Sequence, residues 1–160
     1  MEVLAYEGPD GELSLRPSLE TLTPFFDMGQ DYWQGGSGSA YIGWIKLRSP
    51  GYSTLFERPV LHIIVHEPYG VCLMYEVVSN QPGVAGIALI INNEIPPPDL
   101  LVEHFIGGEA AYFPSRSFVS REVAKRVVAA VLQSPEPPAE VTWRPRRELA
   151  YDGYGYADGQ

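Results

Sequence analysis

Three histidines are the residues of this sequence with the widest range of possible chemistry. His62 and His66 stand four residues apart, a spacing that brings two metal ligands together on a helix. Their neighbours are rich in β-branched residues and predict a strand instead, on which the two rings share one face but lie about 13 Å apart. One metal cannot bind both. A third ligand would have to be His104, and no carboxylate cluster accompanies it, so we expect no metal and no cofactor.

Serine and carboxylate chemistry finds no stronger support. Gly36-Ser37-Gly38 lacks the G-x-S-x-G pattern of a strained nucleophile turn, and its glycine-rich surroundings match neither common phosphate-binding pattern. Two pairs of acids could in principle act as acid and base, but without burial they are explained as solvated surface. These pairs are Asp27 with Asp31 and Glu67 with Glu76. We therefore expect no catalytic residues and no enzymatic activity.

Composition narrows the class of protein further. The 160 residues are 45% hydrophobic and carry a net charge of −9, which fits one globular domain with a core. Nucleic-acid binding needs a basic surface, so the charge favours a basic protein partner instead, although solubility alone also explains it. The sequence shows no membrane-length apolar run and no signal peptide, which predicts a cytoplasmic protein. The single cysteine, Cys72, lies among apolar residues and is expected to be buried.

The elements that must position these residues predict an α+β fold. Residues 40–91 read as successive antiparallel strands, of which the hairpin over residues 58–77 has the clearest pattern. The main helix is expected over about residues 120–133, because Ser120 is a natural N-cap, apolar residues recur on one face, and Pro135 ends the pattern. A terminal strand containing Trp143 follows. We expect a single domain over residues 1–148, with the helix packed on one face of a mostly antiparallel sheet, and a flexible tail over residues 149–160.

Two stretches resemble the Imm1 family of bacterial immunity proteins. One is the amphipathic helix with its proline turn and a P-x-x-V-x-W pattern made by Pro138, Val141 and Trp143. The other is a P-x-L-x-I-x-V strand over residues 59–65, followed by a turn ending in Gly70 and an apolar strand. The resemblance covers roughly residues 59–143 with gaps. It implies an immunity protein that binds and blocks a cognate toxin, often one with a nucleic-acid deaminase domain.

The acidic first third of the chain offers the expected partner-binding surface. Residues 35–39 read Gly-Gly-Ser-Gly-Ser and predict a mobile loop, and the aromatic residues beside it either anchor a partner or cap the sheet. An acidic and aromatic patch would cover the basic cleft that a toxin acting on nucleic acid needs. The expected partner-binding residues are Asp27, Asp31, Tyr32 and Trp33, with Glu67, Tyr69 and Glu94 as second choices.

Two other functions remain open from the sequence. A small enzyme or small-molecule binder would show a deep pocket that holds a histidine beside a carboxylate. An adaptor outside any toxin system would use the same sheet to bind a partner or a second copy of the chain.

Overall fold

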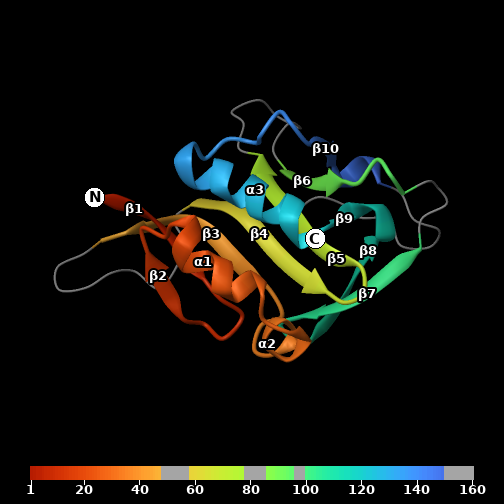
Figure 1. Cartoon of the computed structure of the whole chain (residues 1–160), viewed down its shortest axis with the longest axis horizontal. Coiled ribbons are helices and arrows are strands. Elements are labelled where there is room, and N and C mark those ends of the chain that lie inside the picture. The colour runs from red at the N-terminus through yellow and green to blue at the C-terminus, as the bar shows by residue number, and fades with distance from the viewer. Residues whose placement is uncertain (48–57, 78–85, 96–99, 150–160) are drawn as a thin grey trace.

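One antiparallel sheet organises the structure, a computed structural model that describes residues 1–47, 58–77, 86–95 and 100–149. In the described part of the chain its strand order is β10-β6-β5-β4-β3-β1-β2, and the short β9 also pairs with β5 (Figure 1). A separate two-stranded sheet is formed by β7 and β8. The strands are β1 (Glu2–Glu7), β2 (Leu13–Leu15), β3 (Ala40–Lys46), β4 (Arg58–His66), β5 (Gly70–Val77), β6 (Gly86–Ile91), β7 (Leu101–Ile106), β8 (Glu109–Pro114), β9 (Phe118–Val119) and β10 (Thr142–Pro145).

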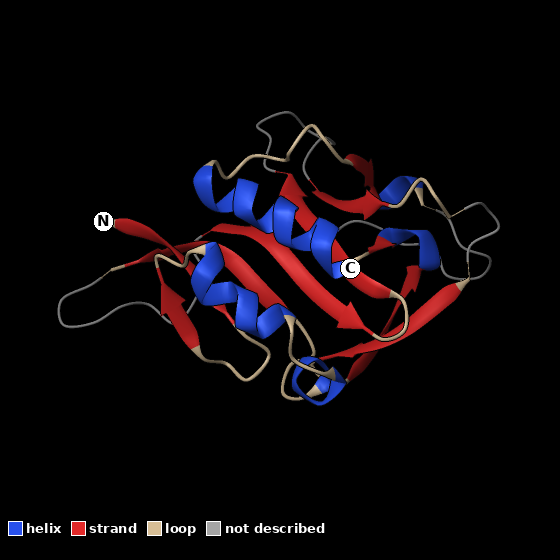
Figure 2. Cartoon of the chain, in the orientation of Figure 1, coloured by secondary structure: helices blue, strands red, loops and turns tan. Residues whose placement is uncertain are grey.

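The helices gather on one face of this sheet. Figure 2 shows α1 and α3 side by side across the strands, with the short α2 below the end of α1. The expected single α+β domain with a mostly antiparallel sheet is confirmed. The α-helices are α1 (Leu19–Phe26), α2 (Gln30–Gln34) and α3 (Arg121–Gln133), and two single 3₁₀ turns are η1 (Ser115–Ser117) and η2 (Arg146–Glu148).

The two faces of the sheet bury different sets of side chains, because successive strand residues point to opposite sides. On the helix side, Ile63 and Leu73 are cross-strand partners and pack with the apolar stripe of α3, including Val127. On the opposite side, Ile64 and Cys72 are partners in a second cluster. Both clusters contain fully buried side chains, so the sheet has a hydrophobic core on each of its two faces.

The second core is covered by the β7–β8 hairpin, which contributes Val102 and Phe113. Leu149 is only 2% exposed and belongs to the same core. The expected flexible tail therefore does not include Leu149, and the rest of it, residues 150–160, lies outside the described residues. Burial raises the pKa of Cys72 to about 12, so its thiol stays protonated at neutral pH and behaves as a small apolar side chain.

The Gly-Ser segment at residues 35–39 has fixed partners in the structure. The amide of Ser37 donates to Pro9 O at 2.9 Å, and the amide of Gly107 donates to Ser37 O at 2.8 Å. Gly38 has a φ of +78°, and a Cβ atom there would lie 2.0 Å from the carbonyl oxygen of Phe105. The glycine content predicted a mobile loop, whereas in the structure the glycine at position 38 permits close contact between two backbones.

This contact makes a matched prediction possible, because Gly11 has a similar φ of +81° with nothing within 4 Å of the added Cβ. We expect Gly11→Ala to lower the free energy of unfolding by about 1 kcal/mol, from backbone strain alone. Gly38→Ala should lower it by about 3 kcal/mol or more, because the backbone of Phe105 must also move. Urea denaturation of both variants measures the difference. Equal losses would show that the segment does not need this close contact.

Candidate partner-binding surface

Three segments of the chain meet at the C-terminal end of α1. The last turn of this helix has no basic side chain of its own, although its free carbonyl groups carry partial negative charge. The guanidinium group of Arg121 supplies the missing cation. Its Nη1 donates hydrogen bonds to the carbonyl oxygen of Phe26 and, at 3.0 Å, to that of Met28. Arg121 therefore caps α1 from a position 95 residues away from Phe26 in the sequence.

Arg121 occupies an unusual position within its own helix. It is the first residue of α3, directly after the N-cap Ser120, whose hydroxyl accepts a hydrogen bond from the amide of Val123. A cation at a helix N-terminus is disfavoured by the helix dipole. The tertiary contacts explain its presence, because the other guanidinium nitrogen, Nη2, forms an ion pair with Glu67 in the β4–β5 turn. One side chain thus joins α3, the end of α1 and the β4–β5 turn.

Lys125 repeats this connection one helical turn later. Its Nζ donates to Asp27 Oδ1 at 2.9 Å and lies 3.6 Å from Glu122. Asp27 is the C-cap residue of α1, so a second cation from α3 sits at the same helix end. The hydrogen bond to Asp27 raises the pKa of Lys125, which keeps the amine charged.

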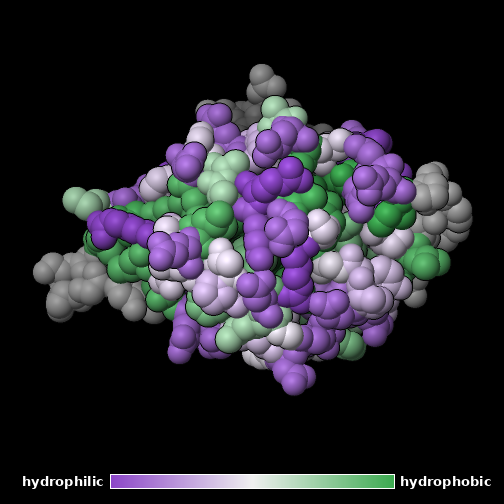
Figure 3. Space-filling model, in the orientation of Figure 1, coloured by the Kyte–Doolittle hydropathy of each residue, from purple (hydrophilic) through white to green (hydrophobic). Residues whose placement is uncertain are grey.

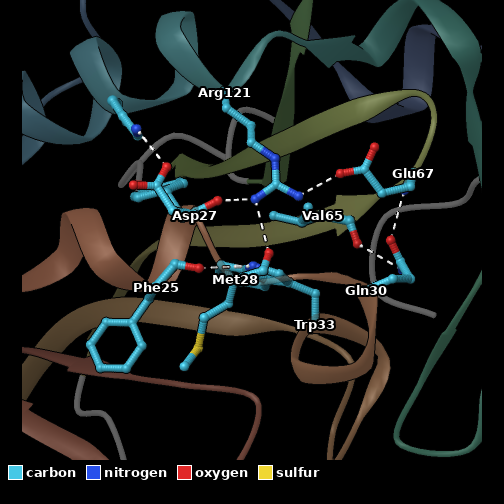
Figure 4. A network of polar contacts seen from close by, with 10 residues as sticks. Phe25, Asp27, Met28, Gln30, Trp33, Val65, Glu67 and Arg121 are labelled. Atoms are coloured by element: carbon cyan, nitrogen blue, oxygen red, sulfur yellow. Dashed lines mark hydrogen bonds and ion pairs between the residues drawn. The ribbon is translucent and has the colours of Figure 1, made fainter.

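Gln30 fixes α2 against the end of β4. Its side-chain Nε2 donates to Val65 O at 3.3 Å, and its Oε1 accepts from the amide of Glu67 at 2.7 Å. One side-chain amide therefore satisfies two backbone groups of the β4–β5 hairpin. Figure 4 shows these contacts together with those of Arg121, which converge from the helices and the turn on the stretch from Phe25 to Gln30.

The exposed residues around this meeting point form a mixed acidic and apolar surface, which we call the junction surface. Figure 3 shows a hydrophilic band that crosses the face carrying α3 and continues toward α2. Within the junction surface the apolar members are Met28, 42% exposed, and Tyr69, 38% exposed. Its members are Asp27, Met28, Asp31, Glu67 and Tyr69. Four of these are expected partner-binding residues, and they come from two segments that the fold brings together.

Trp33 does not belong to this surface, which corrects its expected role as an interface anchor. It is fully buried, its Nε1 donates to Phe25 O at 3.0 Å, and its ring lies 6.1 Å from that of Phe26. Tyr32 is half-buried: it stacks on Phe25, and its hydroxyl lies 3.4 Å from that of Tyr6. Trp33 and Tyr32 therefore follow the alternative expectation, in which the aromatic residues cap the sheet. They lie in α2, which places their rings against the core below the end of α1.

Glu94 lies apart from the junction surface. It lines a groove of about 340 Å³ on the other flank of α3, beside Arg126 and Glu140. Its amide donates to Asn92 Oδ1 at 3.0 Å, which forms the tight turn after β6. This second-choice residue is exposed, but the structure does not bring it together with the other acidic candidates.

Sequence reasoning missed two residues of this region. Met28 was overlooked, although an apolar side chain just before Gly29 in a polar segment is a signal of an exposed contact. Arg121 was not singled out from the other residues of the main helix. A basic residue directly after the N-cap is the signal that could have identified it, because the helix dipole disfavours a cation there.

The histidines are arranged differently from the sequence expectation. His62 lies 3.4 Å from Glu76 across the β4–β5 pair, with its ring against Tyr41. His66 meets His104 instead, with the two Nδ1 atoms 3.0 Å apart. Among the residues that the structure describes, no group of three or more histidine, cysteine or acidic side chains could hold a metal ion. The groove beside Glu94, the pocket beside Tyr75 and the small pocket beside Val127 are not lined by these histidines.

The central role of Arg121 gives a testable prediction. We expect Arg121→Ala to lower the free energy of unfolding by about 1–3 kcal/mol, because it removes charge-assisted hydrogen bonds to two carbonyl groups and one carboxylate. Arg126→Ala is the matched control, since Arg126 is exposed on the same helix, and should change stability by less than about 0.5 kcal/mol. Urea denaturation measures both. Similar losses in the two variants would contradict the proposed anchoring role.

Comparison with known proteins identifies no relative of this chain, so any function has to be argued from its own residues. No protein-family model, no curated protein and no solved structure matches this chain. Within the described ranges, every helix is too short or too polar to cross a membrane.

Proposed function

We propose that this protein is an immunity protein that binds a cognate bacterial toxin and neutralises it by occluding its active or substrate-binding site. The observation that carries the proposal is the junction surface, where exposed Met28 directly follows Asp27, exposed Tyr69 lies two residues after Glu67, and both carboxylates are ion-paired to cations of α3. The Imm1-like patterns in the helix, the terminal strand and the central hairpin support the same function by resemblance.

The junction surface has the chemistry of a binding site for a basic protein. Protein interfaces combine apolar anchors with a polar rim, and carboxylates in the rim select a partner with positive potential. The side chains of Asp27 and Glu67 remain 61% and 51% exposed while paired with cations from α3. Their positions are thus set before a partner arrives, which lowers the entropic cost of binding.

The charge of the whole chain supports the same partner class. At a net charge of −9, the protein would attract a basic surface over a distance set by ionic strength. A toxin that acts on nucleic acid needs a basic cleft to bind phosphate groups. The mechanism we propose is occlusion of this cleft. A nucleic-acid deaminase is the toxin class that the family resemblance implies.

Co-expression with the C-terminal domain encoded by the neighbouring gene tests this function. We expect the chain to protect cells from that domain and to co-purify with it. Co-purification with a non-toxic domain would support the adaptor alternative. If the chain neither protects the cells nor co-purifies with the domain, the proposed immunity function is wrong.

A charge reversal tests the binding surface directly. Asp31 is an exposed residue of α2, and Asp31→Lys should slow association with the toxin domain by about three- to tenfold at low salt. In about 0.5 M NaCl the effect should largely disappear, because salt screens exposed charges. Glu140→Lys makes the same change of net charge beside the groove on the other flank of α3 and is the matched control. Surface plasmon resonance measures both rates. Equal slowing by the two variants would mean that total charge, and not the junction surface, controls binding.

A further inference from the structure

A histidine pair, with one ring fully buried and the other half-buried, joins the β7–β8 hairpin to the main sheet. His66 is the last residue of β4, and His104 lies in the middle of β7. Their Nδ1 atoms are 3.0 Å apart, and the Nε2 of His104 lies 2.6 Å from the carbonyl oxygen of Gly38. The side chain of His104 is fully buried, whereas that of His66 is at the edge, in contact with Tyr69. The pair is not part of the junction surface, although Glu67 follows it directly.

These distances fix the protonation of both rings at neutral pH. A carbonyl oxygen only accepts hydrogen bonds, so His104 must carry its proton on Nε2 to donate to Gly38 O. The Nδ1 of neutral His104 is then an acceptor, and the Nδ1 of His66 must be the donor. The atom of Gln34 that lies 3.4 Å from the same nitrogen of His66 is Nε2, a donor, so this tautomer also requires the Gln34 amide to be flipped, with its oxygen facing His66. The pair therefore requires one particular tautomer of each ring.

The pair holds three separate segments in place. His104 belongs to a hairpin that forms its own two-stranded sheet, His66 ends β4, and Gly38 leads into β3. A second polar contact between the turn of the hairpin and this region is the bond from the Gly107 amide to Ser37 O. An isolated two-stranded hairpin is at best marginally stable in water. Loss of the histidine contact therefore weakens the attachment of the hairpin as a unit.

Added protons disturb this arrangement step by step. One proton can be accepted on Nε2 of His66, whose Nδ1–H then still donates to His104, or on Nδ1 of His104 if His66 changes tautomer and accepts from it. A second proton would place two cationic rings with opposed N–H groups 3.0 Å apart. In the described part of the chain, Glu67 is the carboxylate that acts on His66, and it is already paired with Arg121. The other groups that face the pair, Gln34, Tyr69 and the Gly38 carbonyl, supply no negative charge at these pH values.

We propose that the His66–His104 contact is a pH-sensitive latch: it holds the β7–β8 hairpin against β4 and the Gly38 segment while at least one of the two rings is neutral, and it releases the hairpin when acidification protonates both. The latch stands on its own geometry and does not depend on the proposed immunity function.

The direction of the pH effect follows from the two environments. Burial lowers the pKa of His104, and the neighbouring His66 lowers it further, against a raising effect from the Gly38 carbonyl. Burial also lowers the pKa of His66, although Glu67 opposes this. In the released state both rings have the ordinary pKa of about 6.5. Below this pH the released state binds more protons, so release becomes easier as pH falls until the docked rings also titrate.

Two measurements by nuclear magnetic resonance on the full chain, in the presence of a metal chelator, test the latch. At pH 8, ¹⁵N spectra of the imidazole rings should show His104 protonated on Nε2 and His66 on Nδ1. Protection from hydrogen exchange should then fall for the Gly107 amide and the cross-strand amides of β7 and β8 as pH decreases below about 6.5. If release takes up one proton, the fall is about tenfold per pH unit after correction for intrinsic exchange. The amides shared by β4 and β5 should keep their protection.

Two glutamine variants give the controls. His66→Gln keeps a side-chain donor for His104 and leaves His104 as the one ring of the pair that can take up a proton, so the pH dependence of hairpin protection should be weaker than in the wild type. His62→Gln removes a histidine on the same strand and should leave the pH dependence unchanged. The latch is overturned if the wild-type rings show other tautomers, if hairpin protection does not depend on pH, or if His62→Gln abolishes the dependence. The tautomer measurement decides the question even if His66→Gln does not fold.

Discussion

The contact between Arg121 and the C-terminal end of α1 is the interaction on which the arrangement of the helix face depends. A helix end with free carbonyl groups needs a donor, and α1 has no basic residue in its last turn. The donor comes from the first residue of α3, which also reaches Glu67. The same contact thus satisfies a helix terminus, sets the position of α3 against α1, and holds the β4–β5 turn. The positions of Asp27 and Glu67 in the junction surface are a consequence of this packing, because α3 supplies the cations that pair with them.

The opposite face of the sheet follows a different principle. There the β7–β8 hairpin is attached through an apolar core, a histidine pair and a close approach of two backbones at Gly38. His66 lies one residue before Glu67, so the end of β4 belongs to both arrangements. The rigid junction on one face and the titratable contact on the other therefore share the β4–β5 turn.

The sequence was informative where local patterns decide structure. The apolar periodicity and N-cap at Ser120 predicted a helix, and α3 spans Arg121–Gln133; the β-branched runs predicted the β4–β5 hairpin. It failed where contacts between distant residues decide. Trp33 sits among polar residues beside glycines, yet the fold of α2 places it under α1. His104 was considered only as a metal ligand, because no local pattern shows that β7 crosses the end of β4. The exposed acids were found from composition, but their ion pairs depend on tertiary packing.

The central claim is that Arg121 holds the α1–α2 connection and the β4–β5 turn as one unit, and amide hydrogen exchange in the Arg121→Ala variant tests it most directly. The amides of Met28 and Glu67, which donate to Phe25 O and Gln30 Oε1, report on the two segments. We expect both to lose protection together, by a similar factor, while the amides between β1 and β3 keep theirs. Loss of protection in only one segment, or in neither, would contradict the claim.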